Sequence, residues 1–114
     1  MDRRQEIGQK GERLAINFLK TMGWTIKAHN YRIGHKEIDI IASKNNILSL
    51  FEIKTKINNE NNYIISRTQQ NTLRQAHLAF CDHYQLNPVK VSYSLIVITY
   101  KNKLANLHYY PSFL

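Results

Sequence analysis

Apolar residues near the start of the chain recur at the spacing of an α-helix. At about 100° per residue, six of them share one face of residues 2–22: Ile7, Leu14, Ala15, Phe18, Leu19 and Met22. Gly8 and Gly11 fall on the same face, where the missing side chains would let another segment approach closely. Gly23 then stands where a helix commonly ends. The pattern predicts an amphipathic helix that packs on the rest of the fold.

The next part of the chain predicts three strands. Residues 24–32, 37–43 and 47–55 are rich in β-branched and aromatic side chains, as strands are. Asn45 and Asn46 separate the last two segments, and this pair favours a tight turn. We therefore expect the second and third strands to form an antiparallel hairpin.

A second helix is predicted over 66–84, followed by strands over 89–100 and 104–110. Ser66 is a suitable N-cap for this helix. Its buried face is expected to contain Leu73, Ala76, Phe80 and Tyr84. A crossover through such a helix is long enough to join two parallel strands. The order α-β-β-β-α-β-β predicts an α/β fold of one domain over residues 1–114, with a central mixed sheet flanked by helices.

Charged side chains interrupt the apolar faces of the two hairpin strands. Because side chains alternate faces along a strand, Glu52 and Lys54 point the same way. On the preceding strand the same rule places Asp39 and Ile41 on the face opposite Ile38. If the hairpin register brings Asp39 near Glu52, two carboxylates and one ammonium meet in a half-buried place.

Two carboxylates held together away from water are costly unless a cation neutralises them. Mg²⁺ is well suited, because it binds through one or two carboxylates and keeps its remaining positions for water and substrate oxygens. Mg²⁺ or Mn²⁺, as one ion or two, is therefore the expected cofactor. An ordinary salt bridge between Lys54 and Glu52 or Asp39 explains the same spacing without a metal.

Two helical residues extend this candidate site. Glu12 lies at the edge of the first helix's apolar face, so it is expected at the margin of the sheet; a surface glutamate is the alternative. Gln69 falls near the centre of the second helix's apolar face and close to its start. We expect it to be buried there, where it orients a water or a phosphate or simply caps the core.

The charge balance favours a polyanionic partner. Sixteen Lys and Arg stand against eight Asp and Glu, which gives a formal charge of +8. Four of the eight acids (Glu12, Glu37, Asp39 and Glu52) fall on or beside the candidate site. Clustered Lys and Arg bind phosphate backbones by releasing counterions. A basic surface that only keeps the protein soluble would have the same net charge.

Other classes of site have less support. One cysteine, Cys81, forms neither an intrachain disulfide nor a thiolate cluster. None of the five histidines are spaced as a zinc-binding pair with a glutamate between them. No apolar run approaches the ~20 residues that span a bilayer, and the start does not resemble a signal peptide. A cytoplasmic protein without a membrane partner is therefore expected.

Four short motifs resemble a known bacterial family. They are Gly11-Glu12, Asn30-Tyr31-Arg32, Glu37-Ile38-Asp39-Ile40-Ile41 and Phe51-Glu52-Ile53-Lys54-Thr55. In order and spacing they are similar to the YraN-like family, which is placed in the PD-(D/E)XK nuclease superfamily. The resemblance covers nearly the whole chain.

The resemblance implies a restriction-endonuclease-like sandwich with a metal held by Asp39 and Glu52. It also implies Lys54 as the catalytic lysine and Glu12 as a further acid of the metal site. The chain departs from the family pattern at two positions. Lys36 replaces the glycine that usually precedes the Glu-Ile-Asp run, and Gln69 stands where an early lysine of the second helix is expected.

The leading hypothesis is a Mg²⁺- or Mn²⁺-dependent endonuclease that hydrolyses DNA, with branched or single-stranded DNA as candidate substrates and DNA preferred to RNA. Asp39, Glu52, Lys54 and Gln69 would be catalytic, and Glu12, Asp39 and Glu52 would hold the metal. Five basic residues are candidates for backbone contacts: Arg32, Lys36, Lys56, Arg67 and Arg74. A nucleic-acid-binding accessory protein without catalysis is the alternative, and a homodimer or a larger DNA-processing complex remains open.

Overall fold

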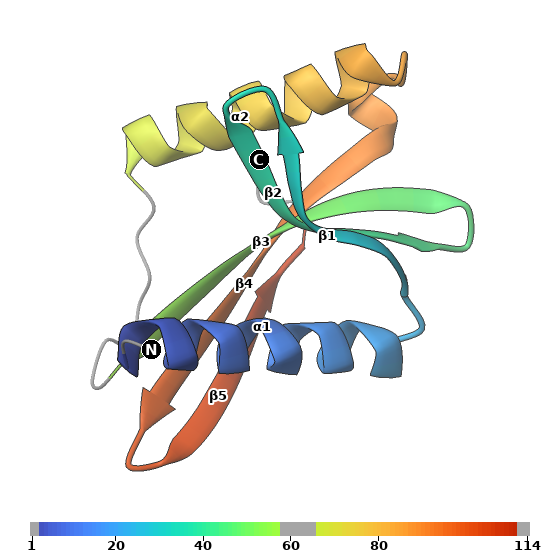
Figure 1. The fold of residues 1–114 in the computed structure, drawn as a ribbon. Coiled ribbons are helices and arrows are strands. Elements are labelled where there is room, and N and C mark those ends of the chain that lie inside the picture. Colours follow the sequence, from blue (N-terminus) through green and yellow to red (C-terminus); the bar gives the residue numbers. More distant parts are fainter. Residues whose placement is uncertain (1–2, 58–65, 112–114) are drawn as a thin grey trace.

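The predicted order of elements is confirmed by a computed structural model, which describes residues 3–57 and 66–111 (Figure 1). The elements are α1 (Arg3–Thr21), β1 (Thr25–Ile33), β2 (Lys36–Lys44), β3 (Ile47–Ile57), α2 (Arg67–His83), a short 3₁₀ helix η1 (Pro88–Lys90), β4 (Val91–Lys101) and β5 (Leu104–Tyr110). The strands form one five-stranded sheet in the order β1-β2-β3-β4-β5.

The sheet is mixed, and its connections follow the predicted turn and crossover signals. β2 and β3 pair antiparallel through a turn at Asn45 and Asn46, whose φ angles are 52° and 65°. Asparagine adopts this left-handed conformation more readily than most residues, which is why the pair makes a tight hairpin. β3 and β4 are parallel and are joined through α2, while β4 and β5 are again antiparallel.

The two helices cover opposite faces of the sheet, and each seals its own apolar core (Figure 1). Under α1, Ala15 and Leu19 are buried against Phe51 of β3 and Ile96 of β4. Under α2 the buried side chains are Leu73, Ala76, Phe80 and Cys81, packed on Ile38, Ile41, Leu50, Val91 and Tyr93. The predicted faces were too wide, because Leu14, Met22 and Tyr84 are exposed by 39%, 47% and 46%.

Helix α1 approaches β3 closely at Gly11. A Cβ atom added to Gly11 would overlap the hydroxyl of Thr55. A Cβ atom on Gly8, one turn earlier, would meet nothing within 4 Å. The expectation of close approach therefore holds for Gly11 and is wrong for Gly8.

The β1–β2 hairpin bends toward α2 (Figure 1). Around Asp39 the simple alternation of faces along β2 is broken. Ile38 packs in the same core as Ile41, on the α2 side, whereas Ile40 packs on the α1 side. The prediction that Ile38 lies opposite Ile41 is therefore wrong. The physical cause lies in the paired strand, because Asn30 of β1, which falls between the partners of Ile38 and Ile40, has a φ of 52° and turns the hairpin there.

Within the described ranges, neither helix has the length and apolar character that a bilayer crossing requires.

Candidate metal and nucleic-acid site

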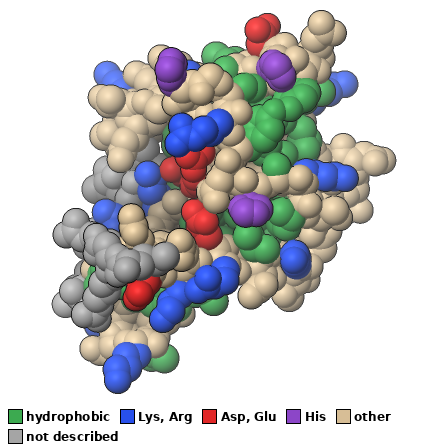
Figure 2. Space-filling model, in the orientation of Figure 1, with side chains coloured by type: hydrophobic (Ala, Val, Ile, Leu, Met, Phe, Trp, Pro, Cys, Tyr) green, Lys and Arg blue, Asp and Glu red, His purple; other side chains and the backbone are tan. Residues whose placement is uncertain are grey.

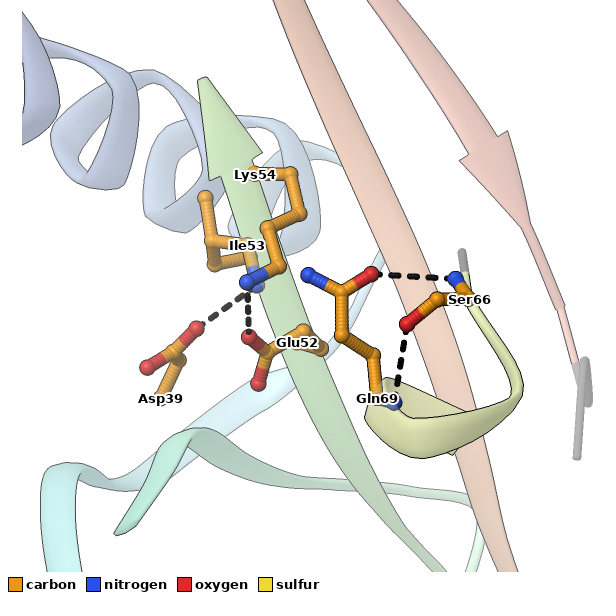
Figure 3. Close-up of polar contacts among 6 residues, drawn as sticks. All are labelled: Asp39, Glu52, Ile53, Lys54, Ser66 and Gln69. Atoms are coloured by element: carbon orange, nitrogen blue, oxygen red, sulfur yellow. Dashed lines mark hydrogen bonds and ion pairs between the residues drawn. The ribbon is translucent and has the colours of Figure 1, made fainter. Parts of the chain in front are cut away.

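Asp39, Glu52 and Lys54 converge on one pocket at the α2 side of the sheet, as predicted (Figure 3). The pocket has a volume of about 260 Å³. It is lined by Glu37 and Asp39 of β2, Glu52 and Lys54 of β3, and Thr68, Gln69, Thr72 and Leu73 of α2. The hairpin supplies the acids and the lysine, and the first two turns of α2 form the opposite wall.

Asp39 is oriented by the backbone of the neighbouring strand. The β2–β3 ladder runs from Lys44↔Ile47 to Ile40↔Phe51. Just beyond its last rung, Oδ2 of Asp39 accepts a hydrogen bond from the backbone N–H of Ile53 at 2.7 Å. Beyond the end of the β2–β3 ladder the carboxylate thus provides an acceptor for the backbone N–H of Ile53. The same hydrogen bond fixes the direction of the Asp39 side chain.

Glu52 is buried, with 9% of its surface exposed. Its Oε1 atom lies 3.2 Å from Nζ of Lys54, in an ion pair that is visible in Figure 3. The two residues are two positions apart on β3 and so share a face of the sheet. The salt bridge considered as the alternative to a metal site is therefore present, but it neutralises only one of the two carboxylates.

The electrostatics of the pair show that one negative charge lacks compensation. Burial, reinforced by the charge of Glu52, raises the pKa of Asp39 to about 7 despite the hydrogen bond from Ile53. Burial also raises the pKa of Glu52, against the opposing effect of Lys54. A divalent cation would relieve this repulsion, and two carboxylates beside an open pocket match the few protein oxygens that Mg²⁺ takes.

Gln69 reaches the pocket by a different route from the one predicted. It is exposed rather than buried, so the expectation that it lies at the centre of the apolar face is wrong. The reason is a capping box. Oε1 of Gln69 accepts from the backbone N–H of Ser66 at 3.0 Å, and the Ser66 hydroxyl accepts from the backbone N–H of Gln69 at 3.1 Å. The amide nitrogen of Gln69 is left facing Glu52 and Lys54 (Figure 3).

Glu12 lies next to the acidic pair but not within its pocket. It lines a second pocket of about 570 Å³ between α1 and the end of β3, which Lys54 also lines. Its charge raises the pKa of Asp39, though less than burial and Glu52 do. Among the described residues no three acids, histidines or cysteines are grouped closely enough to hold one ion. The structure therefore brings together two of the three predicted metal ligands.

The five basic residues predicted to contact nucleic acid are spread around the site. Arg32 pairs with Glu37 at 3.6 Å, with its side chain 72% exposed, and Nζ of Lys36 donates to Gln75 of α2 at 3.2 Å. Lys56 lines the pocket that contains Glu12, whereas Arg74 lines a separate pocket beside His77. In the view of Figure 2, acidic side chains lie in the middle of the molecular surface, with Lys and Arg side chains beside them.

Sequence reasoning missed Thr68 and Thr72, which line the pocket from α2. The hydroxyl of Thr72 donates to the carbonyl of Thr68 at 3.1 Å. Their spacing of four residues on a helix was the available signal, because side chains four positions apart lie on one face. Neither is charged, so composition did not draw attention to them.

The mixed sheet, the helix on each face and the Asp39–Glu52–Lys54 cluster are compatible with a restriction-endonuclease-like protein of the PD-(D/E)XK class. The match to a family is direct. The model of the uncharacterised protein family UPF0102 matches residues 11–98, and the chain belongs to this family, which is the YraN family of the sequence resemblance.

Individual relatives give the same assignment. A UPF0102 protein of Dictyoglomus turgidum is 29% identical over 113 residues, which cover 95% of this chain and 96% of the relative. One from Ehrlichia ruminantium is 33% identical over 89% of this chain and 80% of its own length. A shorter match, to a protein of Chloroherpeton thalassium, is 48% identical over 46% of this chain and 40% of the relative.

Proposed function

We propose that this protein is a Mg²⁺- or Mn²⁺-dependent nuclease that hydrolyses phosphodiester bonds in DNA. The observation that carries the proposal is the carboxylate pair of half-buried Asp39 and buried Glu52, set beside the Lys54 ammonium in an open pocket. An uncharged asparagine could accept the hydrogen bond from Ile53, so a fold that needed only the Glu52–Lys54 salt bridge would not require a second, half-buried acid, which adds repulsion.

Asp39 and Glu52 are the residues that would hold the ion. When bound, a divalent ion neutralises charge on the phosphate and makes water a stronger nucleophile. Because the pKa of Asp39 is raised to about 7, this carboxyl is partly protonated near neutral pH in the absence of the ion. Ion binding and proton release are therefore linked.

Lys54 supplies a positive charge at the same pocket. Its ammonium is held by Glu52, which limits its motion and keeps it beside the acids. A fixed cation in a partly buried site stabilises the negative charge that grows on the phosphate during attack, and it can orient the attacking water. The amide nitrogen of Gln69, presented by the capping box, is placed to donate to a phosphate oxygen or a water.

Basic residues outside the pocket would hold the rest of the substrate. Arg32 and Lys36 border the pocket from the β1–β2 hairpin, and Arg67 begins α2 on the other side. Lys56 continues the positive charge along β3. The net charge of +8 favours association with a polyanion through counterion release.

The test is a cleavage assay on labelled single-stranded, duplex and branched DNA with and without Mg²⁺ or Mn²⁺. Asp39→Asn and Lys54→Met should each lower the cleavage rate by about 10²-fold or more, which is the effect of removing one electrostatic stabiliser. Glu37→Gln, at the rim of the same pocket, serves as the matched control and should retain most of the activity. Full activity in both site variants would overturn the mechanism.

The same assay distinguishes the non-catalytic alternative. A binding protein without catalysis would leave every substrate intact and would bind DNA equally well with EDTA and with Mg²⁺. Its affinity would still fall with salt, because phosphate contacts release counterions.

A further inference from the structure

The acidic pocket continues into a longer groove. Lys54 lines both the acidic pocket and the pocket of about 570 Å³ beside Glu12. Ile7 and Ile57 in turn line that second pocket and a third one of about 500 Å³, which extends to the β4–β5 turn. Each pocket therefore shares lining residues with the next: the acidic pocket lies on the α2 side of β3, and the other two follow the N-terminal half of α1 and the C-terminal end of β3. We call this surface the α1–β3 groove.

Both charge and apolar surface line the α1–β3 groove. Lysines lie along it from end to end: Lys54, Lys56, Lys10 and Lys103. The acids on its walls outside the acidic pocket are Glu6 and Glu12. Ile7, Ile57 and the half-buried Tyr100 provide apolar surface between the lysines. A surface that combines ammonium groups with apolar and aromatic side chains suits a ligand with a charged backbone and flat bases.

The dimensions of the groove favour one strand over a duplex. The two pockets beside α1, of about 570 and about 500 Å³, are in the range that holds drug-sized molecules, so each has room for a nucleotide or a few. A single strand can place its bases against the apolar wall because they are not paired with a second strand. In a duplex, the bases are stacked inside and only phosphates would reach the lysines.

We propose that the α1–β3 groove binds a single-stranded nucleic-acid extension and leads it into the acidic pocket. This inference rests on the proposed nuclease function and assigns it a substrate class, namely nucleic acids with a single-stranded arm next to the cleavage site. Lys10 and Lys103 bind the phosphates of the arm furthest from the acidic pocket. Ile7 and Tyr100 contact its bases.

The test measures binding in EDTA, so that no cleavage occurs, by fluorescence anisotropy of labelled oligonucleotides. The probes are a blunt DNA duplex and the same duplex with a single-stranded extension of either DNA or RNA. The groove variant is the double substitution Lys10→Glu with Lys103→Glu. The control is Lys20→Glu with Lys90→Glu, which changes the net charge equally at the last turn of α1 and at η1, both away from the groove.

The wild type and the control should bind the extended duplex more tightly than the blunt one, and the groove variant should bind the two equally. The logarithm of the binding constant falls linearly with the logarithm of the salt concentration, and for single strands each phosphate contact contributes about 0.7 to the steepness of that slope. Losing two contacts should therefore make the slope of the groove variant shallower by about 1.4. The DNA and RNA arms show which sugar the groove prefers. Equal binding of both duplexes by the wild type, or equal losses in variant and control, would overturn the inference.

The outcome separates this inference from the proposed nuclease function. A preference for the extension that persists in a protein without cleavage activity would support the groove and contradict the catalytic proposal. Cleavage that depends on Asp39 but shows no preference for extended substrates would do the reverse. Thermal unfolding of both double variants verifies that they remain folded.

Discussion

Replacing Asp39 with asparagine should make the metal-free protein more stable at alkaline pH. Asparagine is nearly isosteric, and its carbonyl oxygen can still accept the hydrogen bond from Ile53. The substitution removes a negative charge that is buried next to Glu52. A residue that only built the fold would lose stability on this change, whereas a residue kept for metal binding should gain it.

The magnitude follows from proton linkage. The pKa of Asp39 rises from 3.8 to about 7 on folding. Since the folded pKa is the higher one, the contribution of Asp39 to stability is fully present below pH 3.8 and is lost as pH rises through about 7. A difference of about 3 pKa units corresponds to about 4 kcal/mol. Because the side chain is only partly buried, about 2 kcal/mol is the expected size after solvent screening.

The assay is urea denaturation of the wild type and Asp39→Asn in EDTA, at about pH 4 and about pH 8. The stability of the variant relative to the wild type should increase by about 2 kcal/mol between the two values. Glu37→Gln is the control, because Glu37 lies at the same pocket but is exposed. It should show little change with pH.

Adding Mn²⁺ should reverse the order of stability at pH 8. A ligand at 100 times its Kd stabilises the state that binds it by about 2.7 kcal/mol. Only the wild type should gain this stabilisation. If Asp39→Asn is no more stable than the wild type at alkaline pH in EDTA, the two carboxylates do not destabilise the metal-free fold and the reasoning fails.

Five further substitutions, in three experiments, test how the fold builds the site. Gly11→Ala should destabilise the protein by about 1–3 kcal/mol, because its Cβ would overlap Thr55. Gly8→Ala should stabilise it by about 0.5–1 kcal/mol, because its Cβ meets nothing. Thermal denaturation compares the two variants, and equal shifts in Tm would contradict the close approach of α1 to β3. Asn30→Val should lower the stability of the fold by about 1–2 kcal/mol and weaken Mn²⁺ binding. Asn30→Gly should preserve the stability and the Mn²⁺ affinity, since glycine accepts the positive φ. Equal Mn²⁺ affinity in the two variants would exclude a role for the bend in placing the acids. Ser66→Ala should lower stability by about 1 kcal/mol through loss of the cap, measured by urea denaturation, and an unchanged midpoint would argue against the capping box.

Much of the fold could be predicted because its signals are local. The Asn45-Asn46 turn fixes the β2–β3 hairpin, and the length of the segment through α2 favours the parallel crossover to β4. The Ser66 cap was likewise readable, since a serine before a helical pattern can accept from the first free N–H groups. Neighbouring residues determine each of these features.

The details of the site depend on contacts that local patterns do not encode. Strict alternation predicted the wrong face for Ile38, because the bend at Asn30 is a property of two paired strands. Helical periodicity placed Gln69 in the core, but its side chain closes the capping box with Ser66 at the start of α2 and stays exposed. Partners across elements, such as Gln75 for Lys36, are equally invisible to periodicity.

The central claim is that Asp39 and Glu52 form a site for a divalent cation. Titration calorimetry with Mn²⁺ tests it most directly, using the wild type, Asp39→Asn, Glu52→Gln and the rim control Glu37→Gln at about pH 8, above the raised pKa of Asp39. The account predicts saturable binding by the wild type and the control, and none by the two site variants. Equal binding by all four proteins, or no binding by the wild type, would contradict it.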